Sequence, residues 1–374
     1  MTIPEQHAFK NITIIGLGLI GGSLAQAFRH VGFKGKIQAV SSEATLKTAL
    51  DQKIIDAGFP YGDLLKPVSQ SDLIILASPI QNIMEHIREL GQSTGTLQAG
   101  TVVTDVGSTK RVILEEAERV LPKEIYFIGG HPMAGSEKRG LLAADPFLFQ
   151  NAYYVLTPSH QVPGKIVKIL EGFLSSIGAR VIVLEAREHD RTAAVISHIP
   201  QLLAIALVNF LKDNADNRDH AVRLAAGGFR DMTRIASSPF SMWKDIFQTN
   251  ASEVQEFLKC FIQVLESTSV QVGSEELEKT FDKAALTRAE IPRDSKGFLN
   301  PLCEVLVVVE DRPGMIATIA NTLSDHQINI KDIEVLKVRE DEGGTMRLAF
   351  STLDIAQKAI GLLSAEGLTA RLRE

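Results

Sequence analysis

One glycine-rich stretch combines a histidine with several charged residues. It runs from Gly129 to Gly140 with the sequence GGHPMAGSEKRG and carries His131 and Ser136. Residues 126–128, just before it, are apolar and predict a short buried strand. Glycines let a backbone approach a ligand closely, and strand ends in α/β proteins face the crevice where ligands bind. His131 is therefore a candidate acid–base residue and Ser136 a candidate substrate contact; the alternative is a surface turn with a solvated histidine.

A second glycine-rich stretch, residues 16–21 with the sequence GLGLIG, predicts a dinucleotide-binding turn. It lies between the strand pattern of residues 11–15 and a helical pattern that begins near Ser23. In this GxGxxG motif the first glycine makes the turn, the second admits a pyrophosphate, and the third lets the helix pack on the strand. The free N–H groups at the helix start then bind the phosphates. With the ends of the following strands, the predicted cofactor contacts are Gly16, Gly18, Leu19, Ile20, Gly21, Ser41, Ser78 and Pro79.

The choice between NAD and NADP depends on the end of the next strand, residues 36–40. NAD-binding proteins usually carry an Asp or Glu there for the ribose 2′-hydroxyl, whereas this chain has Ser41-Ser42 with Glu43 just beyond. An arginine suited to the 2′-phosphate of NADP is also missing, and Lys47 is the nearest cation. We expect NAD, and NADP stays open.

The segment from Asp105 to Lys110, DVGSTK, ends one predicted strand and opens a helix. Its Ser108 is expected to face the same crevice as His131, because neighbouring parallel strands end at one edge of the sheet. The alternative reading of Ser108 is a helix N-cap.

Two candidate sites lie in the helical middle of the chain. The strongly apolar stretch 193–211 contains Pro200, which should kink a helix, close to His198. His198 is either a ligand-binding residue or a core histidine bonded to a carbonyl that the proline frees. Further on, Arg230 and Arg234 are four residues apart, on one face if helical. Paired guanidinium groups suit a substrate with carboxylates; the alternative is a solvated basic face.

Apolar runs alternate with helical patterns in the first half of the chain, which predicts a mostly parallel sheet covered on both faces. The predicted strands are residues 11–15, 36–40, 73–77, 101–105, 125–128, 153–156 and 181–184. From Arg187 to Ala289 the strand signals stop and long helical patterns follow. The apolar stretch 193–211 should be either the central helix of a domain or part of a subunit interface.

The end of the chain has a separate pattern. Residues 290–301 are polar with two prolines and predict a linker. The order strand–helix–strand–strand–helix–strand that follows is the ferredoxin-like one. Its loop Asp311-Arg312-Pro313-Gly314 precedes a helix and resembles the loop of ACT domains, which bind amino acids. We therefore expect these four residues to form a regulatory site.

Composition narrows the class of protein. The chain has 374 residues, enough for two or three domains, and its net charge of −6 argues against a nucleic-acid partner. Cys260 and Cys303 are the only cysteines and lie far apart, so neither a disulfide framework nor a metal site is indicated. The first residues are too polar for a signal peptide, and no apolar run approaches the roughly 20 residues that span a bilayer. We expect a cytoplasmic protein.

Taken in order, the motifs GLGLIGGS, DVGSTK, GGHPMAGSEKRG, SHIPQLLA and GGFRDMTRIA resemble those of the prephenate dehydrogenase family, arogenate-using members included. The resemblance covers essentially the whole chain. It implies that His131 accepts a hydrogen bond from the ring hydroxyl of the substrate and that Ser108 bonds the same hydroxyl. It also implies that Arg234 binds a substrate carboxylate and that His198 lies in the active site.

The resemblance further implies oxidative decarboxylation of prephenate to 4-hydroxyphenylpyruvate, a homodimer, and tyrosine as the effector. The expected α/β architecture is a Rossmann-type domain over residues 1–186, an all-α dimerisation domain over 187–289, a linker over 290–301 and an ACT domain over 302–374. Two other classes compete. A β-hydroxyacid dehydrogenase would need a catalytic lysine, which the stretch 193–211 lacks. A non-catalytic dinucleotide and amino-acid sensor would not need His131, Ser108 and both arginines together.

Overall fold

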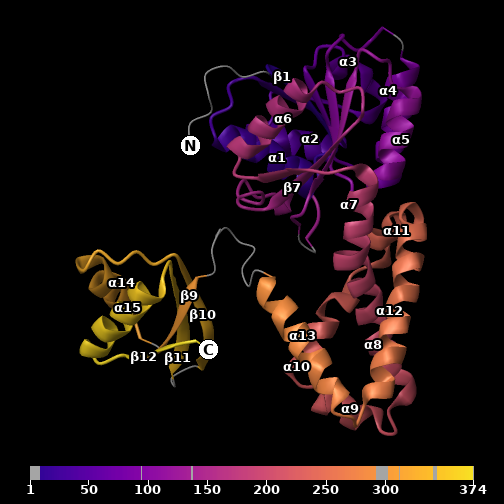
Figure 1. Cartoon of the computed structure of the whole chain (residues 1–374). Helices are drawn as coiled ribbons and strands as arrows, with labels where there is room; N and C mark the ends of the chain where they lie inside the picture. The colour runs from indigo at the N-terminus through magenta and orange to yellow at the C-terminus, as the bar shows by residue number, and fades with distance from the viewer. Residues whose placement is uncertain are drawn as a thin grey trace. The chain divides into compact units, whose positions relative to one another are not determined.

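The computed structural model describes residues 9–93, 95–135, 138–291, 302–310, 312–339 and 343–373. The chain forms two compact units, residues 1–283 and 284–374, each with its own core (Figure 1). Apart from Glu290 and Ile291, the predicted linker lies outside the described residues.

The first unit contains an eight-stranded sheet with the order β3-β2-β1-β4-β5-β6-β7-β8. Its strands are β1 (Asn11–Ile15), β2 (Lys36–Val40), β3 (Ala57–Phe59), β4 (Leu73–Leu76), β5 (Val102–Asp105), β6 (Tyr126–Pro132), β7 (Tyr153–Pro158) and β8 (Arg180–Val183). All neighbouring pairs are parallel except β6 and β7. The predicted, mostly parallel sheet is confirmed, and its strand order reverses beside β1, where α/β proteins bind ligands.

Helices cover both faces of this sheet (Figure 1). They are α1 (Leu19–His30), α2 (Glu43–Asp51), α3 (Leu65–Val68), α4 (Ile80–Gln92), α5 (Arg111–Val120) and α6 (Gly164–Ser176). Apolar side chains of α1 and α6 form one core with the sheet, and those of α4 and α5 form the other. The edge strand β3 and helix α6 were not named among the elements predicted from the sequence. β3 has only three residues, whereas the helical spacing of Val167, Leu170 and Leu174 was a signal for α6.

The second part of this unit is helical, as predicted. Its elements are α7 (Ala186–Ala193), α8 (Ile199–Asn214), α9 (Arg218–Leu224), α10 (Gly227–Thr233), α11 (Phe240–Thr249) and α12 (Ala251–Gln271). Helix α13 (Glu276–Glu290) begins in this unit and extends past its end at residue 283. A π-helical turn, Ala194–His198, joins α7 to α8 directly before Pro200. Proline has no N–H and its ring crowds the carbonyl four residues earlier, so the predicted irregularity takes the form of a wider turn.

We expected no apolar run long enough to span a bilayer, and for this segment the expectation was wrong. The continuous helical stretch Ala186–Asn214 is long and apolar enough to cross a membrane by length and composition alone, with a mean hydropathy of 1.8 in its most apolar window. Only 28% of that window is buried. Exposed apolar side chains such as Ile196 and Phe210 account for much of the uncovered surface.

The second unit contains the predicted ferredoxin-like order. Its elements are β9 (Cys303–Val309), α14 (Met315–Asp325), β10 (Asp332–Arg339), β11 (Gly343–Phe350), α15 (Leu353–Ala365) and β12 (Thr369–Leu372). The strands form one antiparallel sheet with the order β10-β11-β9-β12. Arg347 is almost completely buried in the sheet, where it pairs with Glu304, Asp332 and Glu334.

Candidate active site

The glycine-rich turn after β1 has the shape that a dinucleotide requires. Gly16 has a φ of +99°, which glycine adopts most easily. A Cβ on Gly21 would lie 2.0 Å from the carbonyl oxygen of Gly16, so only glycine fits there. A Cβ on Gly18 would meet nothing within 4 Å, which leaves the space above it open to a ligand. This geometry agrees with the turn and packing roles expected of Gly16 and Gly21, and the contact of Gly18 with a pyrophosphate stays a prediction.

The surroundings of this turn also fit a dinucleotide. The first turn of α1, which begins at Leu19, contains no acidic side chain, so nothing opposes a phosphate at its free N–H groups. Ser41 directly follows β2 and is buried, while Ser78 and Pro79 follow β4. The hydroxyl of Ser78 is buried and has no hydrogen-bond partner, which leaves it available to a bound group.

His131 lies within a strand rather than after one. Strand β6 extends to Pro132 because β7 pairs with it, and His131 lies opposite Val155. His131 as a residue is half-buried, and its Nδ1 lies 2.8 Å from Nε2 of His189. The surface-turn alternative is therefore wrong: this histidine is held by another side chain at the edge of the sheet.

Gly129 and Gly130 were expected to let the backbone approach a ligand, and for these two glycines that reason was wrong. A Cβ on Gly129 would lie 2.3 Å from the hydroxyl of Thr157, and one on Gly130 would lie 2.4 Å from the carbonyl oxygen of Asp105. These positions require glycine because neighbouring strands of the protein approach closely, and not because a ligand does.

A buried ion pair supports the strand that carries His131. The ammonium of Lys110 bonds the carboxylate of Asp105, and both side chains are completely buried. Lys110 Nζ also donates to the carbonyl oxygen of Gly130 at 2.7 Å, and Asp105 accepts the amide of Gly130 at 3.1 Å. The pair thus ties the end of β5 to the backbone residue next to His131.

Sequence reasoning missed His189 and Asp190 on α7. Asp190 is completely buried and accepts the backbone amides of Lys110 at 2.7 Å and Arg111 at 2.9 Å. His189 Nδ1 lies 2.8 Å from the same carboxylate. Both residues are 58 or more positions beyond His131, and their only signal in the sequence was a histidine beside an aspartate at the start of the helical region.

Burial lowers the pKa of both His131 and His198, which favours the neutral imidazole. It is the main reason why the pKa of His131 lies well below 6.5, and His189, the Lys110 ammonium and His198 lower it further. Burial also lowers the pKa of His198 to about 4. A neutral imidazole accepts a proton, so His131 is suited to act as a base near pH 7.

Ser108 is not a helix cap. Helix α5 begins at Arg111, and Asp190 binds the amides at its start. Ser108 instead lies partly exposed in the turn after β5, at the edge of the sheet where β6 carries His131. This placement agrees with the predicted position near His131, and its role with substrate stays a prediction.

His198 is almost completely buried at the end of the π-helical turn. Its Nδ1 lies 3.2 Å from Nδ2 of Asn250, and its ring meets Trp243 and Phe247 edge to face. The bond to a freed carbonyl that we considered is replaced by this side-chain contact. The Nε1 of Trp243 is buried without a partner.

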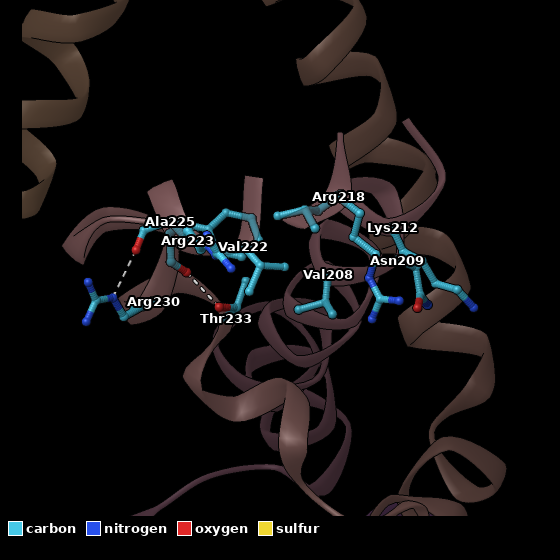
Figure 2. Close-up of a pocket in the computed structure, with 11 residues that line it drawn as sticks. Val208, Asn209, Lys212, Arg218, Val222, Arg223, Ala225, Arg230 and Thr233 are labelled. Carbon is cyan, nitrogen blue, oxygen red and sulfur yellow. Dashed lines mark hydrogen bonds between the residues drawn. The ribbon is translucent and has the colours of Figure 1, made fainter. Parts of the chain in front are cut away.

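The two arginines do not share one α-helix. Helix α10 ends at Thr233, and Arg234 begins a 3₁₀ turn, Arg234–Ser237. Both side chains are exposed, and Arg230 Nε donates to the carbonyl oxygen of Ala225 at 3.1 Å. Figure 2 shows Arg230 on the wall of a pocket of about 620 Å³. The residues that line this pocket are Val208, Asn209, Leu211, Lys212, Arg218, Val222, Arg223, Ala225, Phe229, Arg230 and Thr233.

This pocket is distinct from the His131 site, because none of His131, Ser108, His198 and Arg234 lines it. Arg230 lines this pocket and Arg234 does not, so the joint binding of a substrate by the two arginines stays a prediction. Ser136 lies outside the described residues, so its predicted substrate contact stays a prediction.

The predicted regulatory loop is partly described. Asp311 lies outside the described residues, whereas Arg312, Pro313 and Gly314 line a second pocket of about 570 Å³. Gly314 has a φ of +95° and forms the N-cap of α14. The apolar walls of the pocket come from α14 and the sheet, among them Ile316, Ala320 and Met346.

Comparison with known proteins matches all three parts of the chain. Residues 24–183 match the nucleotide-binding domain of prephenate dehydrogenase, residues 185–284 its dimerisation domain, and residues 304–359 the ACT domain. A prephenate dehydrogenase of Bacillus subtilis is 35% identical over 93% of this chain and 94% of its own. The chain belongs to the prephenate dehydrogenase family.

Solved structures of the prephenate dehydrogenase family agree with this placement. The enzyme of Aquifex aeolicus, determined with hydroxyphenyl propionate and NAD+, has a TM-score of 0.69 and 31% identity, and covers 75% of this chain and 98% of its own. An arogenate dehydrogenase of Synechocystis has a TM-score of 0.68 and 29% identity, and covers 75% and 99%. Membership of the prephenate dehydrogenase family excludes a β-hydroxyacid dehydrogenase. As an NAD-dependent oxidoreductase the protein is also not a non-catalytic sensor.

Proposed function

We propose that this protein oxidises and decarboxylates prephenate to 4-hydroxyphenylpyruvate and transfers the hydride to NAD. The observation that carries the proposal is His131, a neutral imidazole at the sheet edge whose Nδ1 is already bonded to His189. Its other nitrogen, Nε2, is therefore the atom that can accept the proton of a substrate hydroxyl. Family membership supports the substrate class.

The chain would hold the cofactor at the turn after β1. Gly16, Gly18 and Gly21 shape the turn, and the amides of Leu19 and Ile20 at the start of α1 would bind the pyrophosphate. Bound NAD supplies the acceptor for the hydride. Further contacts from Ser41, Ser78 and Pro79 are part of the proposal.

The reaction balances with a single base. Hydride leaves the ring carbon that bears the hydroxyl while His131 draws on the proton of that hydroxyl. The ring carboxylate departs as carbon dioxide, and its bonding electrons complete the aromatic ring. The proton can return to the phenolic oxygen of the product, so the base ends unchanged. We assign the second contact to this hydroxyl to Ser108, and carboxylate binding to Arg234, with His198, Arg230 and Ser136 as additional substrate contacts.

Arogenate is the alternative substrate, because the similar Synechocystis protein is an arogenate dehydrogenase. The two substrates differ at the side chain, where prephenate has a keto group and arogenate an amino group. Steady-state rates of cofactor reduction with both substrates, each with NAD and NADP, test the proposal. We expect prephenate with NAD to have the highest kcat/KM; no turnover of either substrate would refute the proposed activity.

We also propose that the protein acts as a homodimer through its helical part. Ile196, just before α8, is 60% exposed in one chain, and Phe210, on α8, is 63% exposed. Residues 185–284 match a dimerisation domain. A second copy would cover this apolar surface, so we expect a cytoplasmic protein that needs no lipid. Sedimentation in detergent-free buffer should give a dimer.

The ACT domain is proposed to bind tyrosine, the amino acid to which the product leads, at the loop Asp311-Arg312-Pro313-Gly314. The N–H groups at the start of α14 suit the carboxylate of an amino acid, and the apolar walls of the adjacent pocket suit its ring. Feedback inhibition is the expected effect.

A further inference from the structure

We propose that His189 and Asp190 are positioning residues that fix the tautomer of His131, so that its Nε2 is unprotonated and free to accept the substrate proton. The inference rests on the proposed function for the role of His131. His189 and Asp190 are both buried and lie on α7, 58 and 59 positions after His131.

Asp190 binds hydrogen-bond donors through both carboxylate oxygens. Its Oδ1 accepts the amide of Lys110 at 2.7 Å and its Oδ2 the amide of Arg111 at 2.9 Å, and backbone amides can only donate. Both carboxylate oxygens therefore act as acceptors. His189 Nδ1, 2.8 Å from Oδ1, must carry a hydrogen and donate it.

That hydrogen determines the rest of the chain of bonds. A neutral imidazole with a hydrogen on Nδ1 has a lone pair on Nε2. His189 Nε2 then accepts from His131 Nδ1, 2.8 Å away. With its hydrogen on Nδ1, neutral His131 has its lone pair on Nε2, as proton acceptance from a substrate requires.

The opposite polarity would need a positively charged His189 that donates from Nε2. That polarity would also place the hydrogen of His131 on Nε2 and leave no base towards the substrate. The two arrangements therefore predict different protonation of the same atom.

Both positioning residues are rigidly held. The carboxylate of Asp190 is anchored by the start of α5, and its backbone carbonyl accepts Asn250 Nδ2 at 2.8 Å. His189 and Asp190 lie on α7, the first helix after the sheet, and His131 lies on β6. The helical part of the unit therefore orients a base that the sheet carries. A side chain positioned by a partner whose own orientation is fixed loses little entropy when the substrate binds.

Nitrogen NMR of the full-length enzyme with ¹⁵N-labelled histidine rings tests the inference directly, because protonated and unprotonated ring nitrogens differ widely in chemical shift. The signals of His131 are identified by their loss in His131→Asn. We expect an unprotonated Nε2 and a protonated Nδ1 in the wild type near pH 7. A protonated Nε2 in the wild type would overturn the inference.

The variant His189→Phe keeps a ring but removes both nitrogens. We expect the population of His131 with a hydrogen on Nε2 to rise, and kcat to fall by roughly 10²-fold or more, with the KM for prephenate little changed. His160→Phe, at an exposed position, is the matched control and should change neither quantity. An unchanged His131 tautomer in His189→Phe would refute the positioning role.

A second variant covers the case in which His189→Phe does not fold. Asp190→Asn can donate to His189 Nδ1, which would reverse the polarity of both hydrogen bonds and protonate His131 Nε2. Retention of the wild-type tautomer in folded Asp190→Asn would count against the inference. The tautomer is measured without substrate, so an enzyme with the expected tautomer but no turnover would contradict the proposed function alone.

Discussion

The ammonium group of Lys110 bonds the carboxylate of Asp105, and neither side chain has any exposed surface. The pair lies directly behind the strand that carries His131, since Lys110 also donates to the carbonyl of Gly130. Burial lowers the pKa of Lys110, and Asp105 and Asp190 oppose that shift. An ion pair in this position links the stability of the sheet edge to the geometry of the base.

Lys110→Met should destabilise the fold. It leaves Asp105 buried without its cation, and removal of one partner of a buried pair costs about 3–5 kcal/mol. Denaturant unfolding of the full chain measures the loss. Arg119→Met is the control, because the pair between Arg119 and Glu116 is on the surface, and its unfolding midpoint should hardly change. Equal midpoints for both variants would mean that the Lys110 pair contributes little.

His131→Asn should retain hydrogen bonding but lose the proton acceptor. We expect kcat to fall by roughly 10²–10⁴, the range for general acid–base catalysis, with the KM for NAD little changed. Near-normal turnover would show that His131 is not the base.

The pH dependence of the wild type follows from the lowered pKa of His131. The neutral ring is the active form, so activity is complete above the lowered pKa and is lost as the pH falls through it. The acid limb of the kcat/KM profile should therefore lie below pH 6.5, the ordinary histidine value. An acid limb above that value would contradict a lowered pKa of His131.

Arg234→Ala should raise the KM for prephenate by roughly 30-fold or more. Truncating one partner of a desolvated charge pair costs about 2–5 kcal/mol, and each 1.4 kcal/mol is about tenfold. Arg234→Lys should recover only part of the loss, because lysine lacks the bidentate fork. Arg288→Ala, which removes an exposed arginine of α13, is the control. A rise in the KM for NAD with no change for prephenate would place Arg234 elsewhere.

The cofactor preference should be NAD. Glu43 is the first residue of α2, immediately after the end of β2 and its two serines, and its charge should repel a 2′-phosphate. Glu43→Gln should therefore increase kcat/KM with NADP more than with NAD. A wild-type preference for NADP would reverse the assignment, and Ser41→Asp should then shift it towards NAD.

A chain truncated near Asp294 should keep much of its activity but become less sensitive to tyrosine. The proposed catalytic residues all precede α13, and the ACT domain has its own core. In the full-length chain, Gly314→Ala should have the same effect, because alanine is strained at a φ of +95°. Inhibition that is competitive with prephenate and unchanged by truncation would instead place tyrosine in the active site.

Local patterns in the sequence were sufficient for the fold class and for one half of the site. The GxGxxG turn, the alternation of strands and helices, and the ferredoxin-like tail were all predicted, because each depends on residues close together in the chain. Ser108, just after β5, and His131, near the end of β6, could be placed at the same end of the sheet for the same reason.

Tertiary structure alone decided how the base is held and why certain residues are present. His131 bonds His189, 58 positions away, and Asp190 caps α5 from a distance of 80 positions. Gly129 and Gly130 are needed because atoms of the neighbouring strands leave no room for a Cβ. Pro132 lies in a strand because β7 pairs with β6 there. Such contacts depend on which distant segments meet, and no periodicity or spacing within a short window encodes that.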